Sequence, residues 1–170
     1  MNKVKICYIL YLLFCSLFSL SQSKEKIDQI NWIPLDEATQ YAAKYNQKIL
    51  IYFYKKDCPY CDKMQKSTLD DSQIINIINN NFLPVRIDSR TKKNITYNGK
   101  VYSNQQPVDH GYTWRHDFYY EVAKYKKGDS WIVTTPSVVL FDKDFNKTKL
   151  FAGEYSKQRL LREFQKMGIR

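Results

Sequence analysis

Only four of the 170 residues are cysteine, and the sequence has no internal repeat and no low-complexity tract. With these features missing, a chain of this length is expected to form one domain with enough residues for a core. Cys7 and Cys15 fall in an apolar N-terminal segment, which leaves Cys58 and Cys61. One closely spaced pair of cysteines is not the disulfide framework of a small secreted domain. Because the loop between the two cysteines is short, a disulfide there would lower the entropy of the unfolded chain only a little. The pair is therefore interpreted as catalytic or metal-binding.

Long apolar runs are also scarce, and the main one lies at the N-terminus. Lys3 and Lys5 precede an apolar segment over 6–20, and Ser19-Leu20-Ser21 supplies small residues at its end. This pattern is typical of a signal peptide, because the apolar segment is shorter than a membrane span. We expect residues 1–23 to be a signal peptide, cleaved after Ser21 or Ser23. The domain over 24–170 would then be periplasmic or secreted, with no stable membrane span. The alternative is a retained N-terminal anchor.

The charge is strongly basic but carries no sign of a nucleic-acid partner. The formal net charge of +10 falls to +8 when Lys3 and Lys5 are removed with the leader. The remaining lysines are scattered and no nucleic-acid motif is present, so a solvated basic surface is the better interpretation.

Apolar spacing and capping residues predict alternating helices and strands. Continuous apolar runs predict strands, and apolar residues three or four positions apart predict helices. Strands are expected at 32–33, over 48–54, 82–88 and 137–141, and from 149; helices are expected over 35–46, 58–67, from Asp71 or Ser72 to about 79, over 117–126, and after Ser156. This order predicts one α/β domain whose mixed sheet is covered on both faces.

The most informative motif is Cys58-Pro59-Tyr60-Cys61, which directly follows the strand predicted over 48–54. At the start of a helix, with Asp57 as a possible N-cap, unpaired N–H groups and the helix dipole stabilise a thiolate at Cys58. Cys61, one turn later, is placed to attack a mixed disulfide formed at Cys58. The spacing therefore predicts a dithiol redox centre.

An insertion is expected over about 89–117, before the penultimate helix. Residues 95–102 predict a β-hairpin, because Asn98-Gly99 favours a type I′ turn. A polar, aromatic loop follows over 103–116. Two alternative functions depend on this region. The loop at 103–118 could serve a non-catalytic, chaperone-like binding module, or His110 and His116 could bind zinc with the two cysteines.

Four features together resemble a known superfamily. They are Cys58-Pro59-Tyr60-Cys61 after a strand, Thr134-Thr135-Pro136 before the strand at 137–141, a hairpin from Phe141-Asp142 to Ala152-Gly153, and the last helix. Over about 31–167 the chain resembles thioredoxin-fold proteins, and more narrowly small exported bacterial thioredoxin-like thiol–disulfide oxidoreductases. The resemblance implies a thioredoxin-like fold, with a central mixed sheet flanked by helices.

The resemblance also implies residue roles. Pro136 would be a cis-proline that faces the dithiol and contacts the substrate backbone, and Thr135 would present its own backbone to the substrate. Pro59 and Tyr60 would tune the centre and form its exposed rim. Two departures stand out: Pro59-Tyr60 lies between the cysteines, as in glutaredoxins, and Tyr52 stands where many relatives have a buried carboxylate. Tyr52 is interpreted as a core aromatic.

These observations predict an exported thiol–disulfide oxidoreductase that acts on protein cysteines, with Cys58 as nucleophile and Cys61 as resolving thiol. A reductase is favoured, because the chain lacks the helical insertion of dedicated periplasmic oxidants and the dimerisation domain of isomerases. A protein disulfide oxidase or isomerase is the alternative. The expected partners are protein thiols or disulfides and a separate redox partner. We expect a monomer with no cofactor and no metal.

Overall fold

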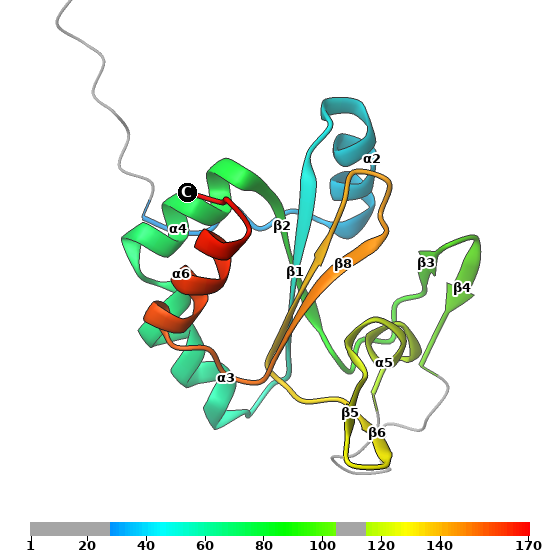
Figure 1. Ribbon diagram of the computed structural model, residues 1–170. Helices are drawn as coiled ribbons and strands as arrows, with labels where there is room; N and C mark the ends of the chain where they lie inside the picture. Colours follow the sequence, from blue (N-terminus) through cyan, green and yellow to red (C-terminus); the bar gives the residue numbers. More distant parts are fainter. Residues whose placement is uncertain (1–27, 105–114) are drawn as a thin grey trace, which may run out of the picture.

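The computed structural model describes residues 28–104 and 115–170, which contain a four-stranded mixed sheet. Its strand order is β2-β1-β7-β8 (Figure 1). The central strand β1 (Lys48–Tyr54) pairs in parallel with β2 (Phe82–Asp88) and antiparallel with β7 (Ser137–Phe141). The last strand, β8 (Lys147–Ala152), pairs antiparallel with β7. The mixed sheet is as predicted, although β8 begins two residues earlier than expected.

Two layers of helices cover the sheet, as Figure 1 shows. One face packs against α4 (Ser72–Asn81), α6 (Lys157–Lys166) and α3 (Pro59–Met64), which continues into a π-helical turn, η1 (Gln65–Leu69). The other face packs against α2 (Leu35–Tyr45) and α5 (Asp117–Ala123). Side chains of β1 alternate between these layers, since successive residues of a strand point to opposite faces. Tyr52 lies in the first core, and Ile51 and Phe53 lie in the second.

The strand expected at Trp32–Ile33 does not form, so that prediction is wrong. One backbone hydrogen bond, from Ile33 N to Pro84 O at 2.9 Å, joins this segment to the outer edge of β2. Pro34 then caps α2. A proline cannot donate a further ladder bond, so the pairing ends there. Trp32 instead packs its ring on Tyr52, with 6.0 Å between ring centroids.

The described part of the region predicted as an insertion, about 89–117, contains one hairpin. The expected hairpin is confirmed as β3 (Ile95–Tyr97) and β4 (Lys100–Tyr102), with positive φ at both Asn98 and Gly99. The loop expected over 103–116, and the signal peptide expected over 1–23, lie largely or wholly outside the described residues.

The helix expected over 117–126 ends at Ala123, which corrects the prediction. Lys124 is extended, with ψ 142°, and the chain enters a second hairpin, β5 (Tyr125–Lys127) and β6 (Ser130–Ile132). Gly128 occupies the turn of this hairpin with φ 61°. Tyr125 continues the helical spacing of Phe118 and Val122, but its side chain is used elsewhere, as described below.

Candidate active site

The dithiol sits where β1 leads into α3. Cys58 is the N-cap of α3: its carbonyl accepts from Cys61 N at 2.9 Å and Asp62 N at 3.0 Å, and its Sγ accepts from Cys61 N at 3.3 Å. Pro59 follows at the first helical position, where its fixed φ suits a helix. The expectation that Asp57 caps this helix is wrong. Asp57 has φ 55° and turns the chain before the cap.

Both thiols are shielded from solvent. Cys58 is 3% exposed and Cys61 is 4% exposed. Burial, followed by a hydrogen bond with Cys58, raises the pKa of Cys61 to about 12. The Cys61 thiol therefore stays protonated at neutral pH. Tyr52 of β1 contacts Cys61, and its hydroxyl, which is protonated at neutral pH, is not a base that could take the Cys61 proton. The Tyr52 hydroxyl donates to Cys61 O at 3.4 Å, and burial raises the pKa of Tyr52 above its ordinary value.

The segment before β7 meets the dithiol. The Thr135–Pro136 peptide bond is cis, as the sequence resemblance implies. The Cys58 thiol donates to the Thr135 carbonyl, with 3.8 Å between Sγ and O. The fold thus brings together Cys58, Cys61, Thr135 and Pro136, from segments 77 residues apart. Pro59 is exposed, and Tyr60 is 65% exposed, so both lie at the solvent-facing rim of α3.

Sequence reasoning missed two tyrosines that contact this segment. Tyr119 donates to Thr134 O at 2.7 Å, and its hydroxyl lies 3.3 Å from Thr135 Oγ1. The Tyr125 hydroxyl lies 2.7 Å from Thr134 Oγ1. No local motif marks either residue, because their role depends on how α5 and β5 pack beside the start of β7.

The position of His116 does not support the alternative in which His110 and His116 bind zinc together with Cys58 and Cys61. His116 is buried as the N-cap of α5, where Nδ1 accepts from Phe118 N at 3.1 Å and Nε2 lies 3.0 Å from Lys93 O. Burial lowers the pKa of His116, which favours the neutral ring that this capping requires. His110 lies outside the described residues. Within 28–104 and 115–170, no three His, Cys, Asp or Glu side chains gather as a metal site.

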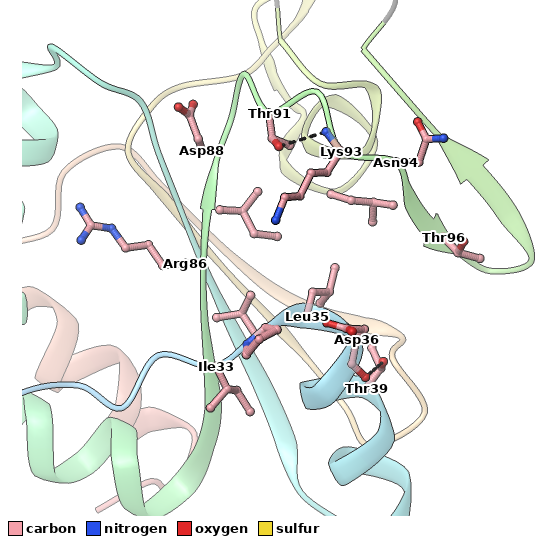
Figure 2. Close-up of a pocket in the computed structure, with 14 residues that line it drawn as sticks. Ile33, Leu35, Asp36, Thr39, Arg86, Asp88, Thr91, Lys93, Asn94 and Thr96 are labelled. Carbon is pink, nitrogen blue, oxygen red and sulfur yellow. Dashed lines mark hydrogen bonds between the residues drawn. The ribbon is translucent and has the colours of Figure 1, made fainter.

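A separate cavity of about 660 Å³ lies beside the outer edge of β2, between the start of α2 and β3. Neither cysteine lines it. Figure 2 shows the Lys93 side chain directed among the apolar lining, whereas Arg86 and Asp88 extend away from it. Arg86 instead lies over the Tyr54 ring, 4.2 Å from its centroid. This cavity is therefore distinct from the dithiol site.

A mixed sheet with a Cys-X-X-Cys pair at the end of its central strand, opposite a cis-proline, defines a thioredoxin-fold thiol–disulfide oxidoreductase. A family model described as a thioredoxin-like domain matches residues 35–168. The chain belongs to this thioredoxin-like family.

Solved structures agree on the fold. An oxidoreductase named DsbH is 16% identical, with a TM-score of 0.56 over 89% of this chain and 94% of that chain. A thioredoxin from Thermus thermophilus is 17% identical, with a TM-score of 0.56 over 82% and 88%. A disulphide isomerase from Xylella fastidiosa Temecula1 is 16% identical, with a TM-score of 0.51 over 82% and 98%. A search of curated proteins found no match.

Proposed function

We propose that this protein is an exported reductase of protein disulfides that works through Cys58 and Cys61. The observation that carries the proposal is the site geometry: Cys58 caps α3 beneath the Thr135 carbonyl, with Cys61 one turn behind it. A Cys58 thiolate attacks one sulfur of a substrate disulfide, and the other substrate sulfur leaves as a thiolate. Cys61 then loses its proton to solvent and attacks the Cys58 sulfur. The second substrate thiolate leaves, so the substrate gains two electrons and the Cys58–Cys61 pair becomes a disulfide.

The reducing direction is supported by one observation. Among the described residues, the connection from β2 to β7 holds two hairpins and the seven-residue α5, which is far smaller than a helical domain. After each turnover a separate redox partner must return electrons to the pair.

We propose that substrate binds across the cis-proline segment. Thr135 has a half-buried side chain and lies outside any strand, so its backbone can pair with an extended substrate. Pro136 would pack against that substrate, and Pro59 and Tyr60 would contact it from the rim of α3.

The proposal of export rests on the apolar segment and small residues in 1–23. In the part of the chain that the structure describes, no helix is long and apolar enough to cross a membrane. We further propose that the mature protein is a monomer. The N-terminal sequence of the exported protein tests the first point, and we expect it to begin at residue 22 or 24. The mass of the exported protein in its native state tests the second.

Two cysteine variants test the proposed chemistry, with a protein disulfide such as that of insulin as substrate and dithiothreitol as electron donor. Cys58→Ser should abolish turnover, because the attacking sulfur is lost. Cys61→Ser should instead accumulate a mixed disulfide, visible by mass spectrometry without reducing agent. Turnover that survives in Cys58→Ser would refute the mechanism.

A further inference from the structure

We infer that Tyr119 and Tyr125 are positioning residues, which hold the Thr134–Thr135 backbone beside Cys58 in the orientation that receives a substrate peptide. The inference rests on the proposed function, because it concerns how the same site binds protein disulfides. It assigns to α5 and β5, which lie between the β3–β4 hairpin and β7, a role in the reaction that no motif in the sequence indicates.

The hydrogen bonds of the segment carry the inference. Tyr119 binds both Thr134 O and Thr135 Oγ1, and Tyr125 binds Thr134 Oγ1. Ser137 Oγ also donates to Thr134 O. All of these bonds approach the segment from the side of α5 and β5 or from the start of β7. The Thr135 carbonyl is left to face the Cys58 thiol.

The segment needs such support because it has no strand partner. Sheet pairing of β7 begins at Ser137, which pairs with Phe53 and Ala152. Thr134 and Thr135 precede that first pair and are both half-buried. A backbone without ladder bonds has more conformational freedom, and side-chain hydrogen bonds can restrict it. The tyrosine hydroxyls therefore supply restraint that the sheet does not.

Tyr119 is itself firmly held and joins the two halves of the site. Its side chain is fully buried, and its ring centroid lies 4.7 Å from that of Phe53. Phe53 belongs to β1, the strand that leads to Cys58. The Tyr119 ring therefore contacts the strand before the dithiol, while the Tyr119 hydroxyl binds the Thr134–Thr135 segment. Burial raises the pKa of Tyr119, which keeps the hydroxyl protonated as a donor. Figure 1 shows α5 and the β5–β6 hairpin beside the chain that enters β7.

Removal of one hydroxyl tests this role without creating a large cavity. The variants are Tyr119→Phe and Tyr125→Phe, and the matched control is Tyr120→Phe, which makes the same change at the next position of α5, where the side chain is 42% exposed. Each reduced protein is reacted with a fluorogenic peptide that contains one disulfide, and separately with iodoacetamide. The peptide reaction needs the Thr135 backbone, whereas alkylation by iodoacetamide needs only the Cys58 thiolate.

We expect Tyr119→Phe to lower the rate constant for the peptide disulfide about fivefold, the loss that one net hydrogen bond produces. Tyr125→Phe should lower it about threefold, because its bond reaches only the Thr134 side chain. In turnover the loss should fall on KM, with kcat nearly unchanged. The alkylation rate and the Tyr120→Phe control should stay within about twofold of wild type.

A loss that is equal for the peptide and for iodoacetamide would overturn the inference, since it would indicate general damage. Rates equal to those of the Tyr120→Phe control would overturn it as well. If Tyr119→Phe does not fold, the same comparison of peptide and iodoacetamide rates is made with Tyr125→Phe, since Tyr125 is only half-buried. A wild-type protein that is alkylated but does not react with the peptide would refute the proposed function instead, so the two failures are distinguishable.

Discussion

Raising the pH should accelerate the second step of disulfide exchange, in which Cys61 attacks the mixed disulfide. Burial is the main reason that the pKa of Cys61 rises from 9.0 to about 12. At pH 7 a thiol of pKa 12 is a thiolate in about one molecule in 10⁵, against about one in 10² for a pKa of 9.0. Because the thiolate is the attacking species, the rate of release should rise about tenfold per pH unit.

This step can be isolated in a single turnover. Cys58 is first converted to a mixed disulfide with a chromophoric aromatic thiol, and release of that thiol is followed by stopped-flow absorbance from about pH 6 to pH 10. A logarithmic rate that stays linear over the whole range is expected. Cys61→Ser is the control and should release no thiol. A rate that levels off near pH 9.0 would refute the reasoning, since it would give Cys61 an ordinary pKa.

Three further predictions concern the core around α5 and the N-caps of α5 and α4. Phe118→Ala should cost about 3–5 kcal/mol of unfolding free energy in urea, because Phe118 is fully buried among aromatic rings; Val101→Ala, 59% exposed, should change it by less than about 0.5 kcal/mol. Burial lowers the pKa of His116 below 6.5, so the unfolded chain binds the proton more tightly, and stability should fall as pH drops below 6.5. His116→Asn, which can still cap α5, should remove that component of the pH dependence. Asp71→Ala should cost about 1 kcal/mol by urea denaturation, because its side chain accepts from two N–H groups at the start of α4.

The central strands could be predicted from the sequence alone. The structure confirms β1, β2 and β7 with both ends as predicted, because each is a short apolar run bounded by polar or turn residues. The β3–β4 hairpin was equally predictable, since the two central residues of its turn both need positive φ and Asn98-Gly99 supplies them. In these segments local chemistry and tertiary structure agree.

Other elements depended on contacts that the sequence does not display. The β5–β6 hairpin was missed because Tyr125 continues the helical spacing of α5, while its hydroxyl binds Thr134 across the fold. The cap of α3 was assigned one residue early, since an aspartate is a common cap and the positive φ of Asp57 has no sequence signal.

The candidate site divides in the same way. The Cys58–Cys61 pair could be found from spacing, because both residues lie within one turn. The approach of Thr135 to Cys58 came from family resemblance, and no periodicity predicts a contact over 77 residues. Tyr119 could not be found from the sequence at all, since a buried tyrosine on a short helix looks like any core aromatic.

The reduction potential of the Cys58–Cys61 pair tests the central claim most directly. The protein without residues 1–23 would be equilibrated with dithiothreitol or glutathione buffers of graded composition, and its dithiol fraction measured by alkylation and mass spectrometry. The account predicts an intramolecular disulfide with a potential near the thioredoxin value, about −270 mV. A potential near about −120 mV would contradict it, because the pair would then donate disulfides rather than reduce them.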